Sequence, residues 1–98
     1  MIIEKPISPG RVLEKQFLQP FDIGNSDLAL KTGLSKKHIS ELRNGHVRFT
    51  AETALLVSKA LGTSPDFWLN LQMQMDVWEG QQKLNERLEK IEPIVLVA

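Results

Sequence analysis

Apolar residues recur along this chain at steps of three and four residues, which is the period of an amphipathic helix. Strict alternation of apolar and polar residues, typical of a half-buried strand, is missing until the last few positions. The pattern therefore predicts an all-α fold. We expect five helices in one domain over residues 1–79, followed by an additional C-terminal helix and a short apolar tail over residues 80–98.

The stretch from Ser26 to Gly45 predicts two short helices around a glycine turn. Ser26 and Ser35 are suitable N-caps, and Gly33 supplies the tight turn that ends the first helix. The buried face of the pair is marked by apolar residues: Leu28, Ala29, Leu34, Ile39 and Leu42. This pattern is typical of a helix-turn-helix, in which the second helix presents its outer residues to the major groove of DNA. A plain helical hairpin with a scaffold role has the same pattern and stays open.

The charge of this region favours DNA as the partner. Between residues 30 and 50 the only anion is Glu41, although the whole chain has a formal net charge of zero. The cations of the region are Lys31, Lys36, Lys37, Arg43 and Arg48. A local basic face on a neutral protein is the expected footprint of a compact DNA-binding module. The alternative is a lysine-rich helix face that is merely solvated.

Capping residues, prolines and glycines set the boundaries of the other helices. Ser8 and Pro9 open the first helix, and Pro20 stops it. Thr50 caps the fourth helix, and Gly62 closes it. The residues expected on the buried side of the fourth helix are Ala54, Leu55, Val57, Ala60 and Leu61.

The last third of the chain is rich in apolar side chains. Ser64 and Pro65 open a fifth helix whose apolar stripe carries both tryptophans. A further helix is predicted from about Gln81 to Glu92, and Pro93 ends it. Residues 94–98 then form a β-branched apolar tail, which could pack, pair with another strand or fray.

We expect a homodimer built largely from residues 64–98, because tight operator binding usually requires two half-sites related by the two-fold axis of the protein. The expected interface residues are Trp68, Leu71, Met75, Trp78, Leu84, Leu88 and Ile91. If Trp68 and Leu71 belong wholly to the core of one chain, the interface shifts towards Trp78 and beyond. The tail could add a strand across the axis or onto a partner.

Catalytic and metal-binding patterns are weak. The chain has no cysteine, and His38 and His46 lack the further ligands of a zinc site. A glycine-rich phosphate loop and a nucleophile motif are both missing. No apolar run approaches the roughly 20 residues that span a bilayer. We therefore expect a cytoplasmic, non-enzymatic protein without cofactor or metal.

Phosphate contacts are expected around the predicted helix-turn-helix. Its helix N-termini favour anions, and arginines flank the turn at Asn44 and Gly45. The candidates are Ser26, Ser35, Arg43, Asn44 and Arg48. For Asn44, a role as a simple helix C-cap is compatible with the same position. The outer face of the second helix, opposite its apolar residues, carries Lys36, Lys37, Ser40 and Glu41.

Three stretches of the chain resemble the HigA-type antitoxins, which are small regulators of the Xre/phage-repressor class of helix-turn-helix proteins. The first is ISPGRVLEKQFLQP over residues 7–20. The second runs from Leu34 to Gly45 and continues at residues 50–55. The third is ALGTSPDFWLNLQ over residues 60–72, followed by Asp76, Val77 and Trp78. FWLNLQ after ALGTSP is far more specific than any general helix-turn-helix pattern.

This resemblance implies a five-helix repressor-like domain, a homodimer and two activities. One activity is to bind and silence a HigB-type toxin, an mRNA-cleaving ribonuclease. The other is to repress the toxin-antitoxin operon at a palindromic operator. Similarity to phage repressors further implies base contacts by Lys36, Lys37 and Glu41, since lysine can donate to guanine and Glu41 can accept from a cytosine amino group. Ser40 lies on the same outer side of the helix, so we expect it to face the major groove with them. Contacts of Lys36 and Lys37 with phosphate alone are the alternative.

Two other functions stay open on the sequence. A stand-alone transcriptional repressor without a toxin would carry the same residues. A helical adaptor that binds only protein would lack salt-sensitive DNA binding. The sequence departs from the resemblance at Ser8, where many relatives have histidine, and in the tail beyond Glu79, which is longer than in minimal members.

Overall fold

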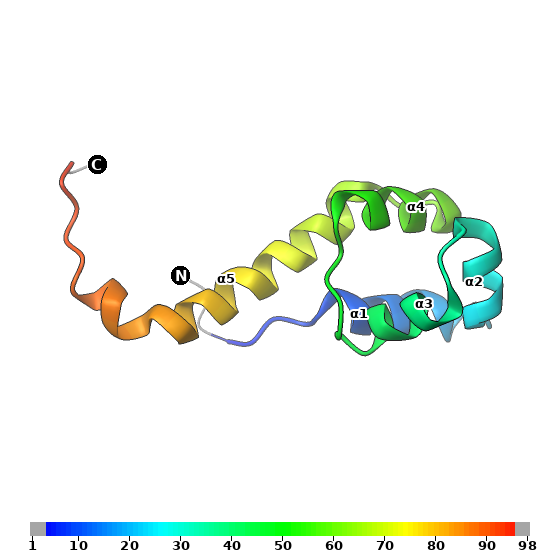
Figure 1. Cartoon of the computed structure of the whole chain (residues 1–98), viewed down its shortest axis with the longest axis horizontal. Coiled ribbons are helices and arrows are strands. Elements are labelled where there is room, and N and C mark those ends of the chain that lie inside the picture. The colour runs from blue at the N-terminus through cyan, green and yellow to red at the C-terminus, as the bar shows by residue number, and fades with distance from the viewer. Residues whose placement is uncertain (1–3, 96–98) are drawn as a thin grey trace.

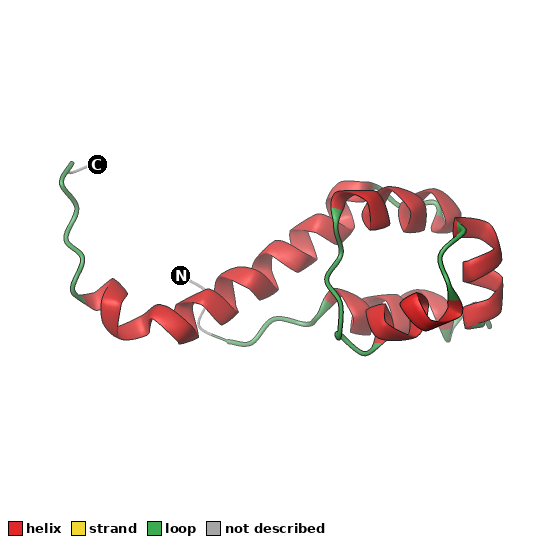
Figure 2. Cartoon of the chain, viewed as in Figure 1, coloured by secondary structure: helices red, strands yellow, loops and turns green. Residues whose placement is uncertain are grey.

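The computed structural model describes residues 4–95 and is all-α, as the sequence predicts (Figure 2). Within this range no residue lies in a strand. The elements in chain order are α1 (Pro9–Val12), η1 (Leu13–Leu18), α2 (Asn25–Thr32), α3 (Lys36–Arg43), α4 (Ala51–Leu61) and α5 (Pro65–Glu89). α1 continues directly into η1, a π-helical turn in which the N–H of Gln19 donates to the carbonyl of Glu14 at 2.9 Å. Counting α1 with η1, the described chain contains five helices.

The helices form a small domain from which the second half of α5 projects (Figure 1). α4 and the start of α5 lie on one side, α1 and α3 lie on the other, and α2 closes one end (Figure 1). The extents of the chain are 50 × 22 × 21 Å. A helix of 25 residues is about 37 Å long, so α5 accounts for most of the long dimension.

The core is centred on Trp68 of α5, whose side chain has no exposed surface. Its ring stacks on that of Phe49 with centroids 5.1 Å apart, and it also packs against Phe17 and Phe67. The indole N–H donates to Oγ1 of Thr63 at 2.8 Å, which satisfies its only polar atom. The other buried members of this core are Val12, Leu13, Leu18, Leu28, Ile39, Leu42, Ala54 and Val57.

Four of the predicted N-caps are confirmed. The hydroxyls of Ser8, Ser35, Thr50 and Ser64 each accept a hydrogen bond from the backbone N–H three residues later. The prediction for Ser26 is wrong, since α2 begins at Asn25 and Gly24 is its N-cap.

Asp27 explains the earlier start of α2. Its carboxylate Oδ2 accepts the N–H of Gly24 at 2.9 Å. A carboxylate in the first turn also suits the positive end of the helix dipole. Ser26 is therefore an exposed residue within the first turn of α2.

The predicted break between a fifth helix and a further helix does not exist. α5 is continuous from Pro65 to Glu89, so the expected division between residues 79 and 80 falls inside one helix. Gly80 lies in its middle, where a glycine costs only about 1 kcal/mol relative to alanine. Its neighbours are good helix formers, and they carry the helix through this position. Beyond α5, the side chains of Ile94 and Val95 are exposed, and the rest of the predicted tail lies outside the described residues.

The buried face of α4 differs from the predicted one. Thr53, Ala54, Val57 and Ser58 point into the core, whereas Leu55 and Ala60 are exposed. All four buried residues are small or β-branched. The prediction that Leu55 is buried rested on its hydrophobicity alone.

The first turn of α1 lies directly against the C-terminal end of α3. A Cβ atom built on Gly10 would lie 2.0 Å from the carbonyl oxygen of Leu42 and 2.9 Å from that of Arg43. Both obstacles are backbone atoms, so a side-chain rotation cannot relieve the overlap. Only glycine allows α1 and α3 to approach this closely.

We predict that Gly10→Ala lowers the free energy of unfolding by about 3 kcal/mol, because the backbone of α1 or α3 must shift to admit the methyl group. Urea denaturation followed by tryptophan fluorescence measures this change. Gly24→Ala is the matched control: its Cβ would meet only the Asp27 carboxylate at 3.4 Å, so it should cost no more than about 1 kcal/mol, the difference between glycine and alanine at an N-cap. Equal losses for the two variants would contradict the proposed steric origin.

Candidate nucleic-acid interface

α3 is a short helix with one buried and one open face. Ile39 and Leu42 are almost completely buried and fix the helix to the core. On the opposite side of the helix, Lys36 and Lys37 are exposed, and Ser40 and Glu41 are half-buried. The four predicted base-contacting residues therefore share the face of α3 opposite the core.

The ends of α3 are well defined. The Ser35 hydroxyl accepts a hydrogen bond from the backbone N–H of His38 at 3.0 Å. Asn44 ends the helix, and Gly45 follows with a φ of 74°. Asn44 is exposed, and its Nδ2 donates to Oγ of Ser40 at 3.5 Å, a long hydrogen bond that links the two side chains on the open side of α3.

Arg43 joins three helices within the domain. Its guanidinium donates to Oδ1 of Asn25 at 2.6 Å and to Oε1 of Glu14 at 3.0 Å. The side chains of Arg43 and Glu14 are only 23% and 28% exposed. This residue therefore holds α3 against η1 and α2. The sequence predicted only a phosphate contact for Arg43 and not this structural role.

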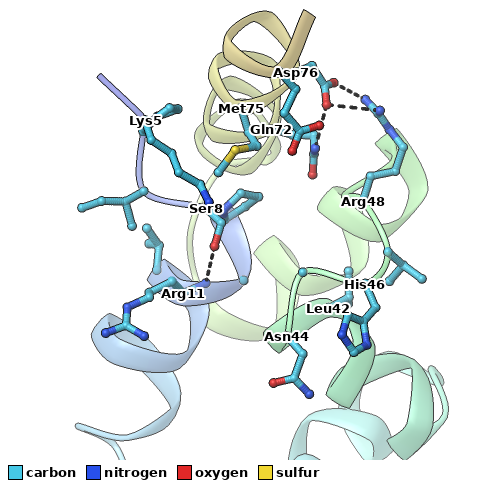
Figure 3. A pocket seen from close by; sticks show the side chains of 18 of the residues that line it. Lys5, Ser8, Arg11, Leu42, Asn44, His46, Arg48, Gln72, Met75 and Asp76 are labelled. Carbon is cyan, nitrogen blue, oxygen red and sulfur yellow. Dashed lines mark hydrogen bonds and ion pairs between the residues drawn. The ribbon is translucent and has the colours of Figure 1, made fainter. Parts of the chain in front are cut away.

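Arg48 takes part in a second network, between the loop after α3 and the middle of α5 (Figure 3). Its guanidinium binds both carboxylate oxygens of Asp76. Asp76 also accepts from Nε2 of Gln72 at 3.0 Å, and Oε1 of Gln72 accepts the backbone N–H of Phe49 at 2.8 Å. The side chain of Arg48 remains 60% exposed, so its guanidinium still faces solvent.

A groove of about 930 Å³ lies between the N-terminal segment, α1, the loop after α3 and α5 (Figure 3). Its polar lining includes four cations, two carboxylates and two neutral side chains: Lys5, Arg11, Lys15, Arg48, Asp76, Glu79, Asn44 and His46. Of these, Arg11 and Lys15 are exposed cations next to the end of α3 that the sequence analysis did not single out. No local pattern marks them, because the groove joins segments far apart in the sequence.

The predicted interface residues divide into two groups on α5. Trp68 and Met75 are buried in their own chain, and Leu71 and Trp78 are half-buried. Trp68 therefore cannot contact a partner. An interface on α5 would instead lie towards Trp78 and the residues after it. The three members with exposed side chains are Leu84, Leu88 and Ile91.

The structure also exposes Met73 and Val77 on α5, which the sequence analysis left out of the interface. They lie on the opposite face of the helix from Met75. In the sequence both faces are apolar, so periodicity alone cannot separate the core from the surface.

Over residues 4–95 no group of three or more His, Cys, Asp or Glu side chains could hold a metal ion. None of the helices in that range is both long and apolar enough to cross a membrane.

Two helices packed around Gly33, with an open polar face on the second, define a domain of the helix-turn-helix class. The model of the family described as "Helix-turn-helix" matches residues 15–68, which is more than half of the chain. The chain belongs to this Xre-type helix-turn-helix family, among the HigA-like antitoxins and regulators.

Three relatives support this assignment. Antitoxin HigA-1 of Vibrio cholerae is 36% identical over 90 residues, covering 92% of this chain and 85% of that protein. An uncharacterised helix-turn-helix transcriptional regulator of Haemophilus influenzae is 35% identical over 95 residues, covering 95% and 89%. The structure of Pseudomonas aeruginosa antitoxin HigA with the higBA promoter matches with a TM-score of 0.85 at 27% identity, covering 92% and 99%. These regulators are not enzymes, in agreement with the prediction from sequence.

We predict that Arg43→Ala lowers the free energy of unfolding by about 1–2 kcal/mol, because it leaves the half-buried carboxylate of Glu14 without its partner. Thermal and urea denaturation provide the measurement. Arg48→Ala is the control, since its more exposed ion pair should contribute less than about 0.5 kcal/mol. The assignment of Arg43 as the structural arginine fails if the Arg48 variant is the less stable of the two.

Proposed function

We propose that this protein is a homodimeric antitoxin that binds a palindromic operator, represses its own operon and neutralises a HigB-type toxin. The observation that carries the proposal is the open face of α3, where four polar side chains stand on a helix that is fixed from behind by Ile39 and Leu42. A rigid helix with an outward polar face suits direct reading of base edges. The P. aeruginosa relative was solved with promoter DNA, which supports the same activity here.

In this proposal Lys36, Lys37, Ser40 and Glu41 contact base edges. Phosphate contacts come from Ser26, Ser35, Asn44 and Arg48, while Arg43 contributes mainly by holding α3. The free N–H groups in the first turns of α2 and α3 favour anions near the two serines. Arg11 and Lys15 add positive charge at the same end of the domain.

Homodimerisation is proposed through the exposed part of α5. Val77, Leu84 and Leu88 are 37–43% exposed, and Ile91 is 66% exposed, on a helix that extends beyond its own domain. Burying such side chains against a second copy removes apolar surface from water. Two copies related by a two-fold axis would also present two α3 helices to the two halves of a palindrome.

A toxin partner is the most specific part of the proposal. It rests on the 36% identity to V. cholerae antitoxin HigA-1 over nearly the whole chain. A stand-alone repressor is the second candidate, and it is favoured by the H. influenzae relative, which is described only as a transcriptional regulator.

Co-expression with the product of the neighbouring gene distinguishes the two. We expect this protein to co-purify with a small ribonuclease-like partner and to abolish its cleavage of mRNA. Operator binding without any such partner would support the stand-alone repressor. An absence of salt-sensitive binding to the DNA upstream of its own gene would overturn both.

We predict that Glu41→Ala changes the ranking of operator variants more than the overall affinity, because it removes an acceptor for a cytosine amino group. Competition binding against single-base operator variants measures the ranking. Arg48→Ala is the matched comparison: it should weaken all sequences alike and reduce the salt-dependence slope by about one unit. An unchanged ranking for the first variant, or an unchanged slope for the second, would contradict the assigned role.

A further inference from the structure

Arg48 already holds an anion of its own chain. Its Nη1 donates to Oδ1 of Asp76 at 3.3 Å, and its Nη2 donates to Oδ2 of the same carboxylate. Both terminal nitrogens of the guanidinium are therefore used in one bidentate contact (Figure 3). Arginine binds phosphate through the same fork of donors. The carboxylate of Asp76 thus occupies the edge of the guanidinium that a bidentate phosphate contact would use.

The carboxylate of Asp76 is held in place by a chain of hydrogen bonds. Nε2 of Gln72 donates to Oδ1 of Asp76 at 3.0 Å, and Oε1 of Gln72 accepts the backbone N–H of Phe49 at 2.8 Å. Gln72 is only 8% exposed, and the ring of Phe49 is stacked on that of Trp68 in the core. α5 therefore presents this carboxylate to Arg48 in a fixed orientation.

The ion pair is nevertheless accessible to a competing anion. The side chain of Arg48 is 60% exposed, and that of Asp76 is 34% exposed. An exposed ion pair is held weakly, because water and salt screen the attraction and both side chains lose conformational freedom. Arg48 lies four residues after Asn44, which ends α3, and both residues line the same groove.

We infer that Asp76 competes with a DNA phosphate for Arg48 and so lowers the affinity of this protein for DNA of every sequence. The inference rests on the DNA binding proposed above, in which Arg48 contacts the DNA backbone while α3 reads the bases. To make that contact, the guanidinium must leave the carboxylate or divide its donors between two anions. In both cases the negative charge of Asp76 stays close to the phosphate and repels it.

The competition gives α5 an influence on DNA binding from a position outside the helix-turn-helix. Phosphates are the same in every sequence, so the loss of affinity is equal for operator and for unrelated DNA. The preference for one sequence over another is therefore left to the side chains of α3, whereas the overall affinity is lowered from α5.

Replacing Asp76 by asparagine removes the competing charge and keeps the shape of the side chain. We expect Asp76→Asn to raise the affinity roughly fourfold, both for the DNA upstream of the gene and for an unrelated duplex of equal length. In a chain that also carries Arg48→Ala, the same substitution should gain less than about twofold, since no cation then draws a phosphate to this point. Fluorescence anisotropy at one salt concentration measures the wild type, both single variants and the double variant.

Glu79→Gln is the matched control. It removes the same charge one turn further along α5, from a residue that lines the same groove. Glu79 forms no ion pair with any described residue, so its loss frees no arginine. We expect this variant to gain less than about twofold in affinity. Thermal denaturation of every variant verifies that the compared chains are equally folded.

The outcomes separate the competition from the DNA binding on which it rests. Weaker binding by Asp76→Asn would mean that Asp76 positions Arg48 for DNA, and the inference would be wrong. A gain that Glu79→Gln matches, or that persists in full without Arg48, would be a general effect of charge and would also overturn the inference. A wild-type chain without salt-sensitive DNA binding would overturn the inference and the proposed function together.

Discussion

The burial of Trp68 is the interaction on which the rest of the structure depends. Its ring packs against Phe17 of η1 and Phe49 of the loop after α3, and its N–H is bound to Thr63. The side chain of Trp68 thereby joins η1, the loop after α3 and α5, which are far apart in the sequence. Because α5 is anchored at this point, its next turn carries Gln72 to the backbone N–H of Phe49. The loop beside the candidate DNA-binding face is thus held both by its aromatic ring and by its backbone.

α3 is held from behind by contacts that leave its outer face free. Gly10 brings the backbone of α1 against the last carbonyl groups of α3, and Arg43 ties the same end to Glu14. Ile39 and Leu42 fill the space between these two attachments. The polar face therefore contributes little to the core, and its side chains can vary with the DNA sequence to be read without a comparable loss of stability.

Those parts of the structure that rest on local interactions could be predicted from the sequence. Ser35 and Thr50 were identified as caps because a cap joins residues three positions apart. The ion pairs of Arg43 and Arg48 could not be predicted, since their partners lie 29 and 28 residues away. The buried face of α5 could not be predicted from the sequence either. Both faces of the helix are apolar, and only its packing against the domain distinguishes them. The helix is continuous through Gly80 because the residues on both sides of this glycine are good helix formers.

Because α5 extends beyond the domain, its two halves differ in the free energy of local unfolding. The turns around Trp68 can open only when the core opens, so their backbone hydrogen bonds share the free energy of global unfolding. The turns after Gly80 pack against no other described helix, and they are held by hydrogen bonds and side chains of the helix itself. Short isolated helices are marginal in water, so we expect hydrogen exchange in these turns to be faster than in the turns around Trp68. The boundary between the two regimes lies near Trp78, where the side chain of Lys5 lies over the indole ring.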